Sequence, residues 1–249
     1  MSVSFLRNAR PRLPREANLT LRIGGLTGLS CTDYPGLLSA VVFCQGCPWR
    51  CSYCHNPHLL APRAAKPLAW NDVCRFLERR RGLLDAVVFS GGEPTLQSGI
   101  ADAMHAAKRM GFRIGLHTAG MYPQRLQSLL PLIDWIGMDI KAPFAEYAAT
   151  TGKPNSAGPV IKSMQLIMAS GVNHEFRTTV HAALLPPEAL FELAQLLARL
   201  GVRNYALQEF RAQGAADSAL PGARSYLTES YCRSLGALFP SFTVRHADR

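Results

Sequence analysis

Three closely spaced cysteines are the residues of this sequence best suited to chemistry. Cys47, Cys51 and Cys54 form a C-x3-C-x2-C triplet directly after an apolar segment at residues 38–43. Three thiolates at this spacing can hold a compact iron–sulfur cluster, whereas a structural zinc site draws two separated ligand pairs and fills all four positions. Three ligands on a four-iron cluster leave one iron free to bind a substrate. The spacing therefore favours a cluster with an open iron.

Cys44 allows a second interpretation of this segment. It extends the triplet to C-x2-C-x3-C-x2-C, which also fits a four-cysteine zinc or ferredoxin-like site. Only three residues separate the two C-x2-C pairs, which is tight for zinc, and Cys44 alternates with Val42 as a small packed residue does. A packed thiol is the expectation for Cys44, with a ligand role as the alternative. The isolated Cys31, Cys74 and Cys232 are interpreted as buried or incidental thiols.

Groups that can bind a ligand also follow the other predicted strands. They are Gly91-Gly92-Glu93-Pro94, His117-Thr118-Ala119-Gly120, Asp139-Ile140-Lys141, Arg177-Thr178-Thr179 and Gln208. The carboxyl ends of parallel strands meet at one edge of a sheet, and α/β barrels and open α/β sheets bind their ligands at that edge. We therefore expect these groups and the cysteines to line one site.

Residue spacing within two of these groups suits ligand binding. Gly91 and Gly92 have no side chains to keep a ligand away from the backbone. Asp139 and Lys141 are separated by one residue on a strand, so they share a face and both can point at one ligand. A tight turn and a surface ion pair are the alternatives.

The last two predicted strands add an arginine and a glutamine. Arg177 and Thr179 share a face, and His181 would join them if the strand extended that far. A charged arginine directed into a barrel needs an anionic partner, for which the carboxylate of a bound ligand is a candidate. Gln208 is interpreted either as a ligand contact or as a satisfied core residue.

Alternation of short β-branched runs with amphipathic stretches predicts the elements that position these groups. Strands are predicted at residues 38–43, 86–89, 113–117, 135–140, 175–180 and 204–208, and helices at about 71–82, 96–110, 122–130, 158–170, 187–200 and 227–237. Asn71 is predicted to cap the first helix, and Gly111, Gly171 and Gly201 to end later ones. This pattern predicts an α/β fold, either a partial (β/α)6 barrel or an open doubly wound sheet.

Composition and charge limit the class of protein. The chain has 249 residues, 18% of them charged, and a net charge of +10, which excludes a disordered chain. It contains no apolar run long enough for a membrane span and no secretory leader, so a cytoplasmic protein without a membrane partner is expected. Residues 1–20 are interpreted as a flexible basic arm and residues 21–249 as one domain. The arginine run at residues 79–81 is either a solvated face or a docking surface.

The cysteine triplet, followed by His55-Asn56-Pro57, resembles the radical S-adenosylmethionine (SAM) superfamily, and within it the activating enzymes of glycyl-radical proteins. Asp33-Tyr34-Pro35-Gly36, residues 89–95 and Met138-Asp139-Ile140-Lys141 belong to the same resemblance, which covers about residues 20 to 240. The pattern is most similar to that of the activating proteins of anaerobic ribonucleoside-triphosphate reductases.

This resemblance implies a cofactor set, a reaction and partners. A [4Fe–4S] cluster on Cys47, Cys51 and Cys54 would bind SAM, and one electron from a low-potential donor such as flavodoxin or ferredoxin would cleave SAM to a 5′-deoxyadenosyl radical. That radical would take a hydrogen atom from a glycine of a glycyl-radical enzyme, an anaerobic ribonucleotide reductase. The residues implied to contact the cofactors are Tyr53, His55, Gly91, Gly92, Glu93, Asp139, Lys141, Arg177 and Thr179.

Two alternative functions remain open, and the sequence differs from the motif of related activating enzymes at one segment. A radical SAM enzyme acting on a small molecule, like the 7-carboxy-7-deazaguanine synthases, is one alternative. A zinc- or cluster-containing nucleic-acid-binding protein is the other, although basic and aromatic residues are not interleaved as such a surface requires. Related activating enzymes often have Asp-Thr-Asn-Gly where this chain has His117-Thr118-Ala119-Gly120, so contacts of that aspartate are not expected here.

Overall fold

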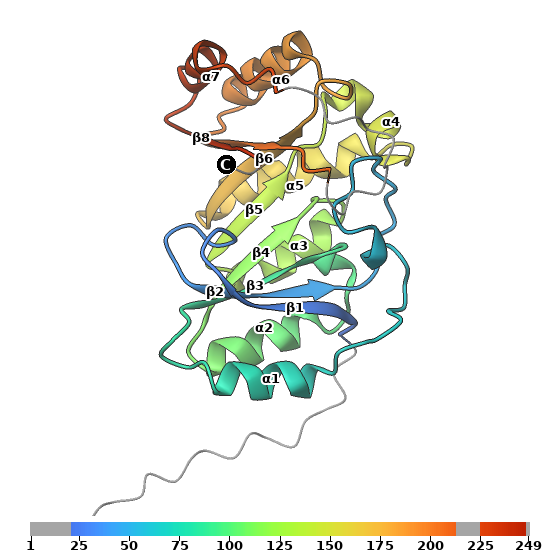
Figure 1. The fold of residues 1–249 in the computed structure, drawn as a ribbon, viewed down its shortest axis with the longest axis vertical. Coiled ribbons are helices and arrows are strands. Elements are labelled where there is room, and N and C mark those ends of the chain that lie inside the picture. Colours follow the sequence, from blue (N-terminus) through green and yellow to red (C-terminus); the bar gives the residue numbers. More distant parts are fainter. Residues whose placement is uncertain (1–20, 213–224, 248–249) are drawn as a thin grey trace, which may run out of the picture.

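One eight-stranded sheet organises the protein. The computed structural model describes residues 21–212 and 225–247, so the arm expected at residues 1–20 lies outside the described part of the chain. The strands are β1 (Ile23–Ser30), β2 (Ser39–Cys44), β3 (Ala86–Gly91), β4 (Arg113–Thr118), β5 (Trp135–Asp139), β6 (Asn173–Val180), β7 (Asn204–Glu209) and β8 (Ser241–Arg245). Figure 1 shows them fanning across the molecule from β1 to β8.

The order of the strands identifies the architecture. It follows the chain from β1 to β8, with β1 antiparallel to β2 and every later neighbour parallel. Right-handed crossovers between successive parallel strands place all connecting helices on the same face of the sheet. A doubly wound sheet instead reverses its strand order and carries helices on both faces. The partial barrel is therefore confirmed, and the doubly wound alternative is wrong.

Six of the seven α-helices in the described residues correspond to predicted ones. The helices are α1 (Trp70–Glu78), α2 (Ile100–Arg109), α3 (Pro123–Leu129), α4 (Tyr147–Thr151), α5 (Ala157–Ser170), α6 (Pro187–Arg199) and α7 (Glu229–Gly236). The short α4 was not predicted. In Figure 1, α1 and α2 lie below one end of the sheet and α6 and α7 above the other.

The three predicted C-cap glycines are confirmed by the helix termini, whereas the predicted N-cap is not. Gly111, Gly171 and Gly201 have φ values of +93°, +75° and +90° at the ends of their helices, as expected for left-handed C-caps. The predicted cap at Asn71 is wrong, because α1 begins one residue earlier and its N-cap is Ala69. The N-cap position therefore lies two residues before Asn71, and Ala69 has no side chain that could cap the helix.

A continuous core joins the helices to the outer face of the sheet. The central strands are buried on both faces, as in other parallel sheets. The buried positions of α2 follow the i, i+3, i+4, i+7 spacing of an amphipathic helix: Ile100, Ala103, Met104 and Ala107. The opposite, inward face of the strands changes from apolar at their amino ends to polar at their carboxyl ends, and this change marks the candidate site.

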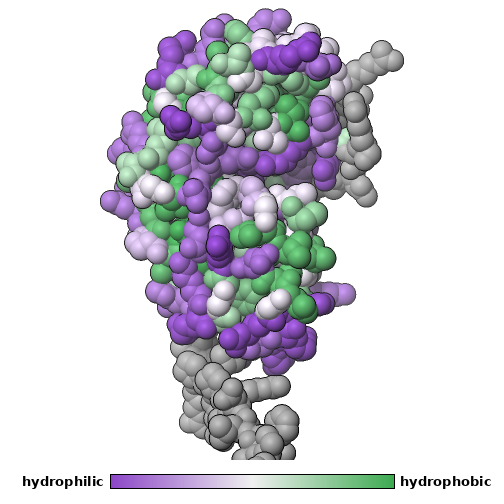
Figure 2. Space-filling view, turned by 90° about the vertical axis from the view of Figure 1, so that its left-hand side faces the viewer, coloured by the Kyte–Doolittle hydropathy of each residue, from purple (hydrophilic) through white to green (hydrophobic). Residues whose placement is uncertain are grey.

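A membrane span requires a helix that is both long and apolar. Among the described helices, none combines the length and the apolarity needed to cross a bilayer. The face in Figure 2 shows hydrophobic side chains gathered in its middle and lower part, with hydrophilic ones around and between them. The basic run at residues 79–81 follows α1 and leads toward the amino end of β3. Arg80 lies over the Phe76 ring, and Arg81 pairs with Glu78.

Candidate active site

A cavity of about 310 Å³ lies at the carboxyl ends of β2 to β7. This volume is within the range of small-molecule sites, about 300–1,000 Å³. All the residues predicted to contact the cluster or cofactor line it except Glu93: Cys47, Cys51, Cys54, Tyr53, His55, Gly91, Gly92, Asp139, Lys141, Arg177 and Thr179. The structure therefore brings together groups that are up to 132 residues apart in the chain, as the sheet-edge argument predicts.

The loop that carries the three cysteines is held by buried amides. The Gln45 side chain donates to the carbonyls of His58 and Ala61, at 3.1 and 2.7 Å, and folds the loop back on itself. Gln97 donates to the Gln45 carbonyl at 2.6 Å. The backbone N–H of Gly46 donates to Leu59 O at 2.7 Å. These hydrogen bonds fix the start of the cysteine loop against β2 without regular secondary structure.

The thiols of this loop differ from Cys44 in their surroundings. Burial raises the pKa of the Cys47 thiol to about 12 and also raises that of Cys51, so these thiols ionise only when a bound cation stabilises the thiolates. Cys44 is fully buried at the end of β2 and does not line the cavity, which confirms the packed interpretation.

The spread of the cysteines bears on the kind of metal. Within residues 21–212 and 225–247, no group of three or more His, Cys, Asp or Glu side chains converges closely enough for a metal ion. A single zinc ion needs its sulfur ligands gathered tightly around it, whereas a four-iron cluster binds each thiolate on a different iron and spreads them around a larger body. Three thiols on the wall of one cavity supply the number of ligands that a four-iron cluster with one open iron requires.

The two glycines after β3 are required by backbone packing. A Cβ at Gly91, where φ is +110°, would lie 2.5 Å from the backbone N of Cys44, and one at Gly92 would lie 2.4 Å from the carbonyl O of Gly46. The N–H of Gly92 also donates to Cys44 O at 2.9 Å. The glycines thus let β3 press against the start of the cysteine loop, while their own backbone lines the cavity. The motif alone predicts these glycines as ligand-binding residues, whereas their packing against the cysteine loop depends on backbone that is distant in the sequence.

Glu93 does not line the cavity, so its predicted contact with the cofactor is corrected to a supporting role. The side chain is fully buried, and burial raises its pKa. Its Oε1 accepts hydrogen bonds from Thr95 N, Thr95 Oγ1 and Thr118 Oγ1, at 3.0, 2.6 and 2.8 Å. Its Oε2 accepts one from Ala119 N at 2.9 Å. Glu93 therefore joins the ends of β3 and β4 beneath the cavity.

Asp139, Lys141 and Arg177 form a charged wall on one side of the cavity, and Asp33 contributes a second carboxylate to the lining. Lys141 Nζ donates to Oδ2 of Asp139 at 3.1 Å, and Arg177 donates to Oδ1 from Nε at 3.1 Å and Nη2 at 3.0 Å. Burial alone raises the pKa of Asp139, but Lys141 and Arg177 outweigh it and hold that pKa well below its ordinary value. The anionic partner that Arg177 needs is thus Asp139 of the same chain. With two cations and one anion, the wall keeps a net positive charge that suits a carboxylate ligand.

Gly137 makes room for Arg177 and was not singled out by its sequence context. It lies inward on β5, and a Cβ there would be 2.8 Å from both Cζ and Nη1 of the guanidinium. Arg177 also donates to the Gly137 carbonyl at 3.3 Å. The inward alternation of β5 from Trp135 through Gly137 to Asp139 is the sequence signal that could have indicated this role.

His117 is neutral and ties β4 to the turn after β1. Its Nε2 lies 2.8 Å from the Asp33 carbonyl, which only accepts, so Nε2 carries the proton and Nδ1 faces the Ser90 hydroxyl at 3.4 Å. Burial, assisted by the nearby Arg177, lowers the pKa of His117 to about 3. The residue therefore offers an uncharged ring at the cavity wall.

Two aromatic residues of the cysteine loop contact neighbouring elements. The Tyr53 hydroxyl donates to Lys141 O at 3.4 Å, and Lys141 Nζ lies 5.7 Å from the centre of the Tyr53 ring. His55 Nε2 accepts from Arg211 N at 3.3 Å. Burial lowers the pKa of His55, so it too is favoured in the neutral form.

The remaining predicted residues divide at the end of β6. Thr179 lies opposite Gln208 on β7, and both line the cavity. His181 lies beyond the last residue of β6 and outside the cavity lining, with its ring 5.0 Å from Phe210. His181 therefore does not join Arg177 and Thr179 on their shared face, because β6 ends at Val180.

Several lining residues were not predicted as ligand contacts. They are Asp33, Phe43, Trp49, Asn56, Leu60 and Ser90, whereas the lining residues His117, Thr118, Ala119 and Gln208 belong to the groups expected at this sheet edge. Ser90 is signalled by strand alternation, because it follows inward Val88 by two residues. Trp49 lies between two cysteines of the loop. Phe43 and Leu60 come from apolar segments whose inward side the sequence does not identify.

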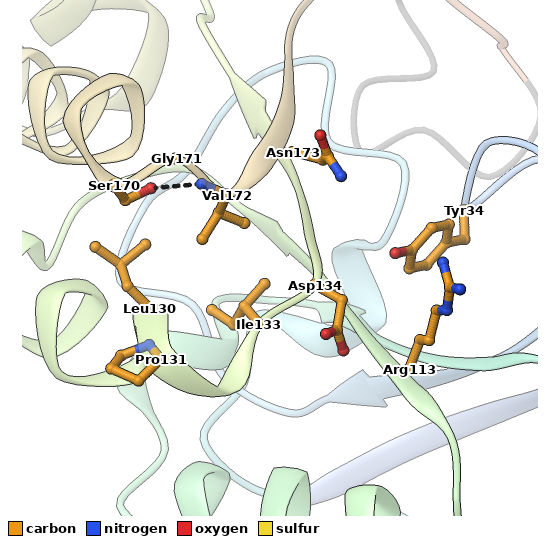
Figure 3. A pocket seen from close by; sticks show the side chains of 10 residues that line it. All are labelled: Tyr34, Arg113, Leu130, Pro131, Ile133, Asp134, Ser170, Gly171, Val172 and Asn173. Carbon is orange, nitrogen blue, oxygen red and sulfur yellow. Dashed lines mark hydrogen bonds between the residues drawn. The ribbon is translucent and has the colours of Figure 1, made fainter.

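A second cavity, of about 560 Å³, lies at the opposite end of the sheet. Arg113, Asp134 and Asn173, at the amino ends of β4, β5 and β6, contribute to its lining. In Figure 3 the side chains of Arg113 and Tyr34 lie next to each other on one wall. The cysteine loop contributes nothing to it, and barrel enzymes conduct their chemistry at the carboxyl ends. The smaller cavity is therefore the candidate active site.

The fold and this site define a class of enzyme, and comparison with known proteins identifies it. The family model described as the radical SAM superfamily matches residues 41–206. The chain belongs to the radical SAM superfamily, whose members use a [4Fe–4S] cluster and SAM.

Comparison with individual proteins shows which radical SAM enzymes this chain is similar to. A Methanocaldococcus jannaschii protein named as a glycyl-radical enzyme activating enzyme, MJ1227, is 29% identical over 78% of this chain and 82% of its own length. The pyruvate formate-lyase-activating enzyme of Clostridium pasteurianum is 34% identical over 53% of this chain and 58% of its own. Streptococcus suis SuiB bound to SAM has a TM-score of 0.59 at 12% identity over 82% of this chain. The chain spans about half of SuiB, 47%.

Proposed function

We propose that this protein activates a glycyl-radical enzyme by generating a radical on one of its glycines. The observation that carries the proposal is the single cavity in which three thiols, a glycine pair and the Asp139–Lys141–Arg177 group meet. Similarity to the glycyl-radical enzyme activating enzymes MJ1227 and pyruvate formate-lyase-activating enzyme supports the choice of substrate class.

The cysteine loop would hold the cluster. Cys47, Cys51 and Cys54 supply three thiolates and leave one iron for SAM, and the bound pair would supply the electron transfer that yields a 5′-deoxyadenosyl radical. The backbone of Gly91 and Gly92 lets the ligand approach the sheet edge closely. These residues bind and orient, while the cofactors carry the difficult step.

The charged wall would orient SAM. Lys141 and Arg177 present positive charge to the SAM carboxylate, and Asp139 holds both cations in place with three hydrogen bonds. Neutral His117 and Ser90 add polar contacts without adding charge. Because Asp139 stays ionised, this wall keeps the same charge across the physiological pH range.

The particular partners are also part of the proposal. We propose an anaerobic ribonucleotide reductase as the substrate protein, a flavodoxin or ferredoxin as the electron donor, and the cytoplasm as the location. The motif pattern supports the reductase, and the absence of a disulfide among the seven cysteines, all in the described range, supports a reducing compartment. Residues 21–249 would form the radical SAM domain behind a basic arm at residues 1–20.

Anaerobic reconstitution with iron and sulfide tests the reaction class. Reduction in the presence of SAM should release 5′-deoxyadenosine from the wild type and not from Cys51→Ala. Cys44→Ala is the matched control, since Cys44 is buried outside the cavity, and it should retain iron. A fully loaded wild type that releases no 5′-deoxyadenosine would contradict the proposal.

The substrate is tested by adding purified glycyl-radical enzymes to the reduced protein. An anaerobic ribonucleotide reductase should acquire a glycine-centred EPR signal, while pyruvate formate-lyase should not. The reverse result would keep the class and change the partner. Cleavage of SAM without a protein radical on either enzyme would favour a small-molecule substrate.

A further inference from the structure

Helix α4 connects the cysteine loop with the charged wall, and Tyr147 is the residue that contacts both. The helix begins six residues after Lys141, and the Tyr147 side chain is fully buried. Two sets of contacts meet at this residue, one through its hydroxyl and the other through its ring.

The hydroxyl of Tyr147 fixes the backbone of the charged wall. It accepts a hydrogen bond from Lys141 N at 2.8 Å and donates one to Asp139 O at 3.4 Å. Both partners are backbone atoms of residues whose side chains form the ion pair. Removing the hydroxyl therefore frees the chain at the point where β5 ends and Lys141 turns into the cavity.

The ring of Tyr147 and the end of α4 contact the cysteine loop. The ring meets Trp49 edge to face, with centroids 6.1 Å apart, and Trp49 lies between Cys47 and Cys51. The N–H of Arg50 donates to the Thr151 carbonyl at 2.9 Å. Thr151 Oγ1 donates to Tyr147 O at 2.7 Å, which holds the two ends of α4 together.

We propose that Tyr147 is a positioning residue that sets the distance between the cluster ligands and the Asp139–Lys141 pair, and that SAM binding depends on it. This inference rests on the proposed function, because SAM must span both groups. Tyr147 touches neither cofactor in this role. It acts through the backbone of the charged wall and through Trp49.

Binding of SAM to the reconstituted protein, measured by equilibrium dialysis without reductant, tests this role. Tyr147→Phe keeps the ring and loses both hydroxyl hydrogen bonds, so it should hold iron normally and weaken SAM binding about tenfold. Tyr147→Leu also loses the contact with Trp49 and should lower iron content. The SAM-induced change in the EPR spectrum of the reduced cluster should be smaller in Tyr147→Phe than in the wild type.

Tyr226→Phe is the matched control, because the Tyr226 hydroxyl donates to Leu185 O at 2.5 Å, outside the candidate site. It should bind SAM as the wild type does. An affinity of Tyr147→Phe within twofold of the wild type, or an equal loss in Tyr226→Phe, would overturn the inference. If Tyr147→Phe fails to fold, Thr151→Val is measured instead. A weaker affinity at normal iron content then supports the inference, and an unchanged one overturns it.

The two proposals fail differently in these measurements. Wild-type protein that binds SAM but does not cleave it would contradict the proposed function, while the dialysis comparison between variants would still decide the role of Tyr147.

Discussion

Arg177 donates two hydrogen bonds to the same oxygen of Asp139, from Nε at 3.1 Å and from Nη2 at 3.0 Å. The two residues are direct neighbours on adjacent strands, so the register of β5 against β6 places them together. The second oxygen of the carboxylate remains for Lys141. Asp139 is therefore the shared counter-ion of two cations from different parts of the chain.

This arrangement predicts acid-sensitive stability. The folded pKa of Asp139 lies below its ordinary value of 3.8, so its stabilisation is complete above about pH 5 and is lost as the pH falls through the ordinary value toward the folded one. The Tm of cluster-free wild type should fall more steeply between pH 5 and pH 3 than that of Asp139→Asn. Parallel curves for the two proteins would show that the ion pairs contribute nothing.

His117 predicts a second effect in a different pH range. Its pKa of about 3 in the folded protein lies below the ordinary 6.5, so the unfolded chain takes up a proton first as the pH falls. Stability from the neutral ring is present above about pH 7 and declines as the pH falls toward 3. His117→Gln should lose less Tm than the wild type between pH 7 and pH 5, where Asp139 does not titrate. A variant as sensitive as the wild type in that range would contradict this account.

Gly137→Ala should weaken SAM binding by displacing Arg177. The new Cβ would lie 2.8 Å from the guanidinium carbon of Arg177 and 2.8 Å from the Trp135 ring, so these side chains must shift, and a shift of Arg177 disturbs its hydrogen bonds to Asp139. We expect an affinity loss of about tenfold, as for a hydrogen bond to a charged group. Gly158→Ala is the control, because a Cβ there meets nothing within 4 Å and alanine favours the helix. Equal affinities for both variants would contradict the prediction.

Gly92→Ala should act on the metal instead of on SAM. Its Cβ would lie 2.4 Å from the Gly46 carbonyl, and moving that backbone shifts the start of the cysteine loop. Iron content after reconstitution should fall to less than half of the wild-type value, with a stability loss of about 1–3 kcal/mol from overpacking. Gly25→Ala, whose Cβ would meet its nearest neighbour at 3.8 Å, should load iron normally. Full iron content in Gly92→Ala would show that the loop tolerates the shift.

The sequence predicts the parts of the site that reside in local patterns. The cysteine spacing, the glycine pair and the i, i+2 pairs at Asp139 and Arg177 are all readable from one segment at a time, and the sheet edge then collects them. Strand β1 was not predicted, because it contains Gly24, Gly25 and Gly28, and glycine has a low strand propensity. Strand β8 was also not predicted, and it is a short edge strand of only five residues.

Roles that depend on distant partners could not be predicted. The need for glycine at position 137 comes from Arg177, which lies 40 residues further along the chain. Tyr147 lies in a five-residue helix without a clear period, and its significance comes from Trp49 and Lys141 on either side. The motif predicts that Glu93 contacts a ligand, but its carboxylate accepts four hydrogen bonds from Thr95, Thr118 and Ala119 and does not line the cavity.

The strand order has a consequence for how the protein assembles during synthesis. Because each strand pairs with the one before it, the sheet can grow at one edge as the chain emerges. The start of the cysteine loop packs against β2 and β3 and is held by Gln97, all within the first 97 residues. Lys141, α4 and Arg177 are translated later, so the cysteine loop gains its contacts with α4 and the cavity gains its charged wall only after β1 to β3 have been made.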